Sequence, residues 1–327
     1  MSEPAPRPPA LTRDLLQQLF DELLPGRAPV AEVTRFAEGT VSGAYQVTFA
    51  DAQADPVVVK LPAPEYPWAA AKEVHVYRLL AEHAIPAVPQ VLAFEESAPL
   101  LDGLPCTVLT MQPGEPLSGV SEDMDESELF DIYRQLGASL AAIHRIPMDA
   151  YGYIVADIVR PQPDNVRHMN SHFVSLLREF QEHGGDTDLA AAVIEHVSQR
   201  NAVFAACTQP VLCHGDFHSG NLLVQRDEAG QWQLTGVIDV ENAHAADPLV
   251  DIVRTEAFSI EDSRPKRAGL LAGYGLAGDE WPDAWRERMH TYRIALAIEL
   301  WNWFTISGAP QHLPGLEQEL RQLLAIS

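Results

Sequence analysis

The sequence gathers polar side chains in one short segment. Residues 214–221 read His-Gly-Asp-Phe-His-Ser-Gly-Asn, with an apolar run before them at 211–213 and another after them at 222–224. Because glycines interrupt a polar stretch that apolar runs enclose, the pattern predicts a tight loop between two buried strands. Asp216 and Asn221 would then be held at fixed positions on that loop.

A third candidate, Asp239, follows the apolar run 236–238 and is predicted at the end of another buried strand. Two carboxylates and a carboxamide suit a hard, oxygen-ligated cation such as Mg²⁺, and one carboxylate remains for proton transfer. Two other interpretations stay open. The polar loop residues can simply stabilise turns, and the alternation His214-x-Asp216-x-His218 offers three ligands to the zinc of a metal hydrolase.

The elements that must position these residues form a β-rich part followed by a helical part. In the first part, helices are predicted at 11–24 and 68–83, and strands at 32–36, 44–49, 57–61, 90–94 and 106–111. A small glycine-containing turn at 37–43 joins the first two strands. The Pro-Gly-Glu-Pro segment at 113–116 then breaks the pattern. This break predicts two domains, residues 1–112 and 113–327.

Helical periodicity dominates the second part of the chain. Helices are predicted at 129–143, at 173–180, from 249 onward, at 281–304 and at 316–325. A β-rich island at 210–240 lies among them and carries the polar loop. The predicted fold class is therefore α+β, with chemistry-bearing residues on the island.

Charge and composition exclude several classes of function. The 327 residues carry 46 acidic and 22 basic side chains, a formal net charge of −24. Such a chain repels nucleic-acid phosphates and anionic lipid but attracts a cationic ligand, so we expect no nucleic-acid or membrane partner. The three cysteines are widely spaced, which argues against a disulfide framework or a thiolate zinc site.

Targeting signals are not expected. The proline-rich residues 1–10 contain no apolar run, so they are predicted to be neither a signal peptide nor an anchor. No stretch approaches the ~20 apolar residues of a membrane-spanning helix. A cytoplasmic protein is expected.

The pattern H-G-D-x-x-x-x-N followed by I-D-x-E resembles the aminoglycoside phosphotransferase family, the small-molecule branch of the protein-kinase-like fold. Upstream parts appear in the order of that family. Lys60 ends the run Val-Val-Val-Lys, Glu73 follows thirteen residues later, and Thr110-Met111-Gln112 resembles the linker between lobes. The segment Asp-Pro-Leu-Val-Asp at 247–251 resembles the family's D-P-x-x-D. The resemblance implies a two-lobed fold, with a β-rich N-terminal lobe containing one key helix and a mainly helical C-terminal lobe.

The resemblance also implies residue roles in an ATP- or GTP-dependent phosphotransferase. Asp216 would accept the proton of the substrate hydroxyl, and His214 would brace the loop. Asn221 and Asp239 would bind Mg²⁺. The nucleotide would be held by a set comprising Lys60 on the phosphates, Glu73 paired with that lysine, and the backbone of Thr110, Met111 and Gln112 on adenine. Val240 departs from the family, which commonly has an aromatic residue after the metal aspartate.

The acceptor is less narrowly defined. The family phosphorylates aminoglycosides, macrolides, peptide antibiotics, choline, homoserine, sugars and fructosamines. The net charge of −24 favours a cationic antibiotic such as an aminoglycoside, and hence a role in antibiotic resistance. Candidate acidic contacts in the C-terminal part are Glu256, Glu261, Asp262 and Glu299. The acidity can instead serve solubility, and an inactive nucleotide-binding scaffold remains an alternative. No obligate protein partner is evident.

Overall fold

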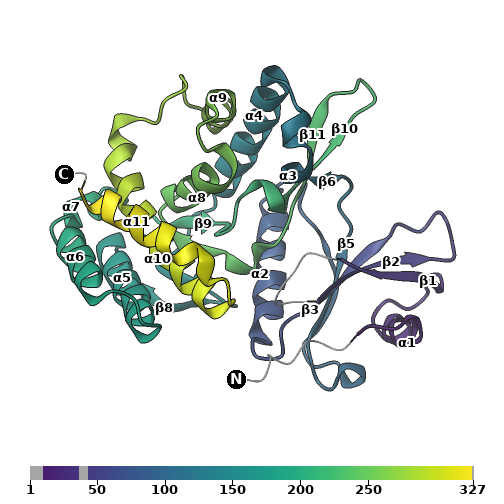
Figure 1. Ribbon diagram of the computed structural model, residues 1–327. Helices are drawn as coiled ribbons and strands as arrows, with labels where there is room; N and C mark the ends of the chain where they lie inside the picture. Colours follow the sequence, from purple (N-terminus) through teal and green to yellow (C-terminus); the bar gives the residue numbers. More distant parts are fainter. Residues whose placement is uncertain (1–9, 37–42, 326–327) are drawn as a thin grey trace. The chain divides into compact units, whose positions relative to one another are not determined.

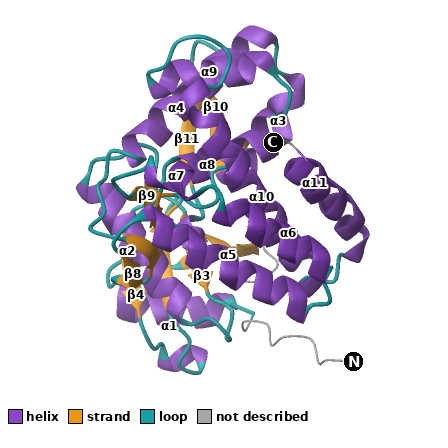
Figure 2. Cartoon of the chain, turned by 90° about the vertical axis from the view of Figure 1, so that its left-hand side faces the viewer, coloured by secondary structure: helices purple, strands orange, loops and turns teal. Residues whose placement is uncertain are grey.

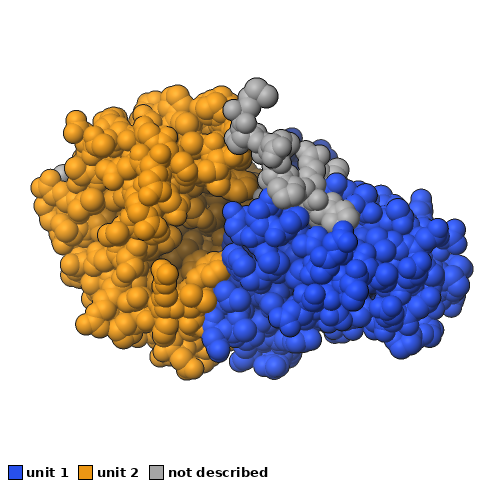
Figure 3. Space-filling model, turned by 90° about the horizontal axis from the view of Figure 1, so that it is seen from below, with its two compact units in different colours: residues 1–124, 154–157, 219–242 blue, residues 125–153, 158–218, 243–327 orange. Residues whose placement is uncertain are grey.

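A computed structural model describes residues 10–36 and 43–325 of the chain (Figure 1). The turn predicted at 37–43 lies outside the described residues except for Gly43. The chain forms two compact units, which Figure 3 distinguishes by colour. The first unit comprises residues 1–124, 154–157 and 219–242, and the second comprises 125–153, 158–218 and 243–327. The first unit thus continues past the predicted boundary at residue 112 to residue 124, and it includes two later segments of the chain.

The first unit is built on a five-stranded antiparallel sheet in the order β1-β2-β3-β5-β4. Its strands are β1 (Val30–Arg35), β2 (Gly43–Phe49), β3 (Val57–Leu61), β4 (Val91–Glu95) and β5 (Cys106–Thr110). Along β2 and β3 every second residue is fully buried, as the period of a strand requires. The odd-numbered residues of β3 therefore point to one face of the sheet, and Val58 and Lys60 point to the other.

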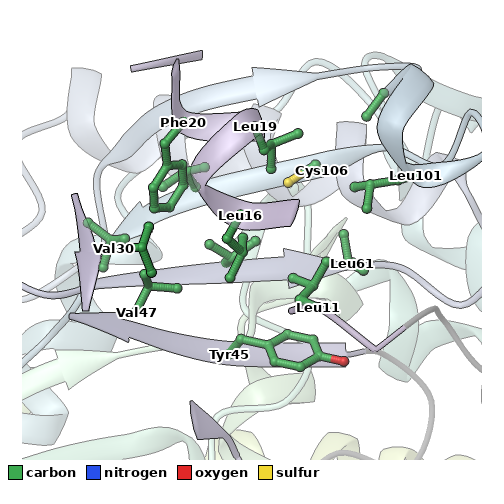
Figure 4. Packing of buried hydrophobic residues seen from close by; sticks show 14 of the residues in the cluster. Leu11, Leu16, Leu19, Phe20, Val30, Tyr45, Val47, Leu61, Leu101 and Cys106 are labelled. Atoms are coloured by element: carbon green, nitrogen blue, oxygen red, sulfur yellow. The ribbon is translucent and has the colours of Figure 1, made fainter. Parts of the chain in front are cut away.

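Helix α1 (Arg13–Leu23) covers the first of these faces (Figure 4). Thr12 caps its N-terminus by accepting a hydrogen bond from Leu15 N at 3.3 Å. The buried residues of α1 pack into one apolar cluster with the sheet. That cluster includes Leu16, Leu19, Phe20, Val30, Tyr45, Val47, Val57, Val59, Leu61, Cys106 and Val108. Because α1 and its cluster occupy this face, the side chain of Lys60 is directed away from them.

Helix α2 (Trp68–Glu82) also belongs to the first unit. It begins directly after Pro67, and proline is tolerated at the start of an α-helix but not in its interior. The helix buries Val74, Tyr77 and Leu80. It also buries two charged residues, Lys72 and Glu73. Charged side chains are rarely fully buried unless they are paired, so this helix carries more than a packing role.

A second, smaller sheet brings a late segment of the chain into the first unit. It has the order β11-β10-β6, with β6 (Glu115–Pro116), β10 (Leu222–Arg226) and β11 (Trp232–Val237). Gly114, with φ of 103°, lies so close to β10 that a Cβ atom would approach Val224 O to 2.5 Å. At the end of β11, Val237 N donates to Ala87 O at 2.7 Å. These contacts fix the residues that follow β11 relative to α2 and the larger sheet. Helix α3 (Leu117–Val120) completes this unit.

The second unit is mainly helical, and its helices are among the purple elements of Figure 2. Its helices are α4 (Glu126–Ile143), α5 (Asn165–Glu182), α6 (Thr187–Ser198), α7 (Asn201–Ala205), α8 (Leu249–Thr255), α9 (Arg264–Tyr274), α10 (Asp283–Ile306) and α11 (Leu313–Ala325). A π-helical turn, Glu256–Ile260, continues α8. Short 3₁₀ helices in the two units are Pro99–Leu101, Ser121–Asp123, Ser219–Asn221, Val240–Asn242 and Pro310–His312. None of the helices within the described ranges is long and apolar enough to cross a membrane.

Four short strands also belong to the helical part, in the order β8-β7-β12-β9. They are β7 (Tyr151–Ile154), β8 (Ile158–Gln162), β9 (Val211–Cys213) and β12 (His244–Ala246). Strand β9 pairs antiparallel with β12, with Cys213 opposite His244. The polar loop of residues 214–221 therefore starts from a paired strand end.

Helices α4 and α9 pack closely through glycines. A Cβ atom on Gly137 would lie 2.1 Å from Leu270 O, and one on Gly273 would lie 1.9 Å from Arg134 O. Helix α4 begins with a capping box in which Asp125 and Glu128 each bind the other's backbone N–H. From α4, the Tyr133 hydroxyl donates a hydrogen bond to Ser259 O at 2.7 Å, in the π-helical turn that follows α8.

Candidate active site

Lys60 occupies the centre of a charged cluster in the first unit. Its Nζ donates to Glu73 Oε1 at 2.5 Å and to Asp239 Oδ1 at 3.1 Å. Strand β3 directs the lysine to the face opposite α1, and α2 brings Glu73 to the same place. The Lys60 and Glu73 side chains are 14% and 5% exposed, whereas that of Asp239 is 38% exposed. The lysine is thus held by a buried carboxylate on one side and reaches a more accessible carboxylate on the other.

The electrostatics of Lys60 favour its charged form. Burial works to lower its pKa, but the carboxylates of Asp239 and Glu73 outweigh burial and raise the pKa well above its ordinary value. The ammonium group therefore persists at every physiological pH. A permanent, oriented cation of this kind is suited to binding phosphate oxygens.

Asp239 has a backbone conformation that needs support. Its φ is 65°, in the left-handed region that residues other than glycine seldom adopt. The buried Tyr77 accepts a hydrogen bond from Asp239 N at 3.1 Å through its hydroxyl oxygen. Burial, followed by the neighbouring Glu73 carboxylate, raises the pKa of Tyr77, so this hydroxyl stays neutral. Tyr77 therefore fixes the backbone that carries the Asp239 carboxylate.

A cavity of about 370 Å³ opens beside this cluster, entirely within the first unit. Its polar wall includes Lys60, Asn221 and Asp239. Its lining also contains Phe36, Ala44, Val58, Tyr77, Pro89, Leu109, Thr110, Met111, Gln112, Gly114, Pro116, Gly220, Leu223 and Ile238. A mainly apolar pocket with a few polar groups in its lining is the usual form of a small-molecule site.

The segment after β5 forms part of the cavity wall. Gln90 N donates to Thr110 Oγ1 at 2.8 Å, and Gln112 Nε2 donates to the same oxygen at 3.2 Å. These bonds hold the backbone of residues 110–112 in a defined conformation along the cavity. Backbone groups presented in this way can recognise the edge of a planar heterocycle.

Asn221 and Asp239 both line this cavity, and a backbone hydrogen bond joins the segments that carry them. Asn221 O accepts a hydrogen bond from Ile238 N at 3.0 Å, which joins the end of the polar loop to the residue before Asp239. Their side chains offer a carboxamide and a carboxylate oxygen, the donor types that Mg²⁺ takes in nucleotide sites. The residues present therefore fit a divalent cation.

The second unit contains Asp216. Its Oδ1 lies 3.5 Å from Arg254 Nη1, and its Oδ2 lies 3.5 Å from His218 Nε2. Burial works to raise the pKa of Asp216, but the hydrogen bond from His218 and the charge of Arg254 outweigh burial and lower the pKa. The side chain is 21% exposed, so the carboxylate remains accessible to solvent.

The backbone around Asp216 is clamped by the buried Asp251 of α8. Asp251 accepts from His214 N at 2.7 Å, from Gly215 N at 2.8 Å and from His144 Nε2 at 3.0 Å. His214 Nδ1 in turn accepts from Asp216 N at 3.2 Å. Two amides and one imidazole therefore converge on one carboxylate beneath the loop.

The four acidic residues considered for an acceptor lie in two places in the second unit. Glu299 on α10 pairs with Arg254 at 2.8 Å, next to Asp216. The other three, Glu256, Glu261 and Asp262, line a cavity of about 440 Å³. Of the residues of α8, Val253 lines this cavity, whereas Arg254, the partner of Glu299, does not.

Some contributing residues are not evident from the sequence. Tyr77 contacts Asp239, which is 162 residues away in the sequence. Arg254 contacts Asp216, 38 residues away, and His144 contacts Asp251, 107 residues away. Only the i, i+3 spacing of Asp251 and Arg254 on one helix offers a local signal, because residues at that spacing share a face.

Comparison with known proteins assigns the chain to a family. Residues 32–288, more than half of the chain, match the model of the phosphotransferase enzyme family. An apo structure of a thermostable mutant of aminoglycoside phosphotransferase APH(4)-Ia has a TM-score of 0.67 at 17% identity, covering 97% of this chain and 100% of that one. A further structure of an APH(4)-Ia mutant is a ternary complex with ADP and hygromycin B.

Two other structures are similar. A protein described as a fructosamine-3-kinase from Thermobifida fusca has a TM-score of 0.69 at 18% identity, covering 94% of this chain and 98% of its own. A GDP complex of an aminoglycoside 2'-phosphotransferase-IIIa mutant has a TM-score of 0.67 at 16% identity, covering 96% and 98%. The chain therefore belongs to the phosphotransferase enzyme family and has the α+β, protein-kinase-like fold of the aminoglycoside phosphotransferases.

Proposed function

We propose that this phosphotransferase transfers the γ-phosphate of ATP or GTP to a hydroxyl group of a small molecule. The observation that carries the proposal is the pairing of Lys60 with Glu73 and with Asp239 beside the 370 Å³ cavity, which Lys60 and Asp239 line. The ADP and GDP complexes of the similar structures support a nucleotide as the ligand of this cavity.

The nucleotide is proposed to bind with its base along residues 110–112 and its phosphates toward Lys60. The lysine would contact the α- and β-phosphates, and Glu73 would keep it extended. Asn221 and Asp239 would hold Mg²⁺, which, when bound, neutralises charge on the phosphate oxygens. Since phosphoryl transfer requires mainly positioning and charge neutralisation, this set of residues needs no covalent chemistry.

Asp216 is proposed as the proton acceptor. As the acceptor oxygen forms its bond to the γ-phosphorus, the bond from that phosphorus to the β–γ bridging oxygen breaks, and the hydroxyl proton passes to Asp216. The lowered pKa of Asp216 keeps the carboxylate ionised before the reaction. A positioned proton acceptor typically contributes about 10²–10⁴-fold to the rate.

For the acceptor, we propose a cationic antibiotic such as an aminoglycoside, which implies a role in antibiotic resistance. The net charge of −24 and the hygromycin B complex of a similar enzyme support this class. A metabolite such as a fructosamine is the second candidate. It is favoured by the similarity to the Thermobifida protein, and by the arginine partners of Glu256 and Glu299, which offset their charge.

A phosphotransfer screen tests the function. Radiolabelled ATP and GTP would be offered with Mg²⁺ and a panel of aminoglycosides, macrolides, fructosamines, choline, homoserine and neutral sugars. We expect transfer to at least one acceptor, lost in Asp216→Asn by at least about 10²-fold while nucleotide binding survives. Asp239→Ala should lose Mg²⁺-dependent nucleotide binding as well. Nucleotide binding without transfer to any acceptor would favour an inactive scaffold, and zinc-dependent hydrolysis would favour a hydrolase.

Ionic strength tests the acceptor class. For a cationic acceptor, KM should rise steeply with salt, because the Debye length falls from about 10 Å at 0.1 M to about 3 Å at 1 M. Transfer to neutral compounds alone would contradict the antibiotic assignment. A cytoplasmic location and action without an obligate protein partner complete the proposal, since the nucleotide donor is abundant inside cells.

A further inference from the structure

Helix α8 contacts the loop of Asp216 at several successive points. Asp251 accepts the two amides before Asp216, as described above. One turn further along, Thr255 Oγ1 donates to Phe217 O at 2.8 Å. Between them, Arg254 reaches the Asp216 side chain itself. The helix therefore holds the backbone on both sides of Asp216 and also contacts its carboxylate.

Arg254 is itself held in place. Its Nη1 lies 3.5 Å from Asp216 Oδ1, and its Nη2 donates to Glu299 Oε1 at 2.8 Å. Its guanidinium carbon lies 6.0 Å from the centre of the Phe258 ring. The Arg254 side chain is only 13% exposed, whereas that of Glu299 is 45% exposed. A buried arginine thus lies between two carboxylates that come from a loop and from α10.

We propose that Arg254 is the positioning residue for Asp216, and that Glu299 positions Arg254. The inference rests on the proposed function, in which Asp216 accepts the proton of the acceptor hydroxyl. Arg254 contacts one carboxylate oxygen of Asp216 and so limits rotation of that side chain, while the other oxygen lies next to His218. In this arrangement Glu299 orients Arg254, which in turn orients Asp216. Glu299 does not bind the acceptor directly.

The alternative roles predict different results. If Glu299 binds a cationic acceptor directly, Glu299→Gln raises the acceptor KM and leaves kcat unchanged. If Arg254 is only structural, its replacement lowers stability but does not change the protonation of Asp216. The other titratable groups that act on Asp216, Arg254 or their neighbours are His172, His214, His218, His244 and Asp251. None of these is altered in the test, so their contribution is constant.

The test compares Arg254→Met, Arg254→Lys and Glu299→Gln. Carboxyl-carbon NMR titration measures the midpoint of Asp216 without any acceptor, and Asp216→Asn assigns the signal. Because an adjacent arginine lowers an aspartate pKa by about 1–3 units, Arg254→Met should raise the midpoint by about one pH unit. Arg254→Lys should restore most of that change, and Glu299→Gln should give a smaller rise.

Kinetics supply the second readout. With an acceptor from the screen, Arg254→Met should lower kcat by about 10–100-fold. In the pH profile of kcat, the loss of activity on the acidic side should occur at a higher pH than in the wild type. Arg254→Lys should recover part of both changes. Arg288→Met is the matched control, because Arg288 is also 13% exposed and pairs with buried Asp247 at 3.1 Å. It should cost stability but leave the Asp216 midpoint unchanged.

The inference would be overturned if both Arg254 variants left the Asp216 titration midpoint and kcat unchanged. It would also be overturned if Glu299→Gln raised the acceptor KM but changed neither kcat nor the Asp216 midpoint. A midpoint shift of equal size in Arg288→Met would overturn it too. Asp216→Asn separates this failure from failure of the proposed function. If Asp216→Asn retains wild-type kcat, the proposed role of Asp216 is wrong. If it is inactive while Arg254→Met is normal, only the positioning role is wrong.

Discussion

Replacing Asp251 by asparagine should destabilise the second unit strongly, although the two side chains have nearly the same shape. The Asp251 carboxylate is buried and accepts three hydrogen bonds, from two backbone amides and one imidazole. An asparagine has one acceptor oxygen and one amino group. Whichever way it is turned, the amino group faces a buried N–H donor, so at least one hydrogen bond is replaced by a repulsive contact.

Two arguments give a similar magnitude. Losing a hydrogen bond to a charged group costs about 1.5–3 kcal/mol. Independently, burial works to raise the pKa of Asp251, but the hydrogen bond and charge of His144, together with nearby histidines, outweigh it and lower the pKa from 3.8 to about 2. At 1.36 kcal/mol per pH unit, this lowering corresponds to roughly 2–3 kcal/mol of stabilisation. We therefore expect Asp251→Asn to lower the free energy of unfolding by about 2–3 kcal/mol at pH 7.

Urea unfolding followed by tryptophan fluorescence measures the change, and Asp149→Asn, at an exposed position of the same unit, is the control. A group with a depressed pKa stabilises the fold above its unfolded pKa and loses that effect as pH falls through the folded pKa. The difference between wild type and Asp251→Asn should thus stay constant from pH 7 to pH 5 and narrow below about pH 4. A loss under 0.5 kcal/mol, or one equal to that of Asp149→Asn, would refute the reasoning.

Three further predictions concern stability and binding. Burial lowers the pKa of Lys72 from 10.5 to about 7. Between these two pH values the unfolded chain binds more protons than the folded chain, so the free energy of unfolding of the wild type should rise from pH 7 to pH 9. Thermal unfolding of Lys72→Met should not show this rise. Tyr77→Phe removes the acceptor of Asp239 N and should cost about 0.5–1.5 kcal/mol and weaken Mg·ATP binding severalfold in calorimetry. Gly137→Ala should cost about 1–3 kcal/mol in urea unfolding, because its Cβ would collide with a carbonyl of α9, whereas Gly315→Ala meets no atom within 4 Å and should be neutral or slightly stabilising.

The elements with strong local patterns could be predicted from the sequence. Strand β3 has the predicted bounds, and α2 ends one residue before the predicted end. Alternation in β3 and the apolar residues of α2 report burial directly, so the pattern and the structure share one cause. The family was also predictable, because the loop of Asp216 and Asn221 is compact in sequence.

The contacts that support the site could not be predicted in the same way. Strands β6 and β12 have only two and three residues, too short for any periodicity to appear. The partners of Tyr77 and Arg254 are chosen by long-range packing, which local sequence does not encode. For the same reason, the pairing of Glu299 with Arg254 could not be predicted from the sequence around Glu299.

The discontinuous first unit has a consequence for synthesis on the ribosome. All five strands of its larger sheet are complete by residue 110, but Asp239 follows Lys60 by 179 residues. At ~5–20 residues per second, translation of the 129 residues between Thr110 and Asp239 takes roughly 6–26 s. During this time the nascent sheet carries Lys60 and Glu73 without their third partner, and β6 without β10. We expect ribosome-stalled chains ending before residue 219 to show no Mg²⁺-dependent nucleotide binding, so that the enzyme acquires this capacity only late in its own translation.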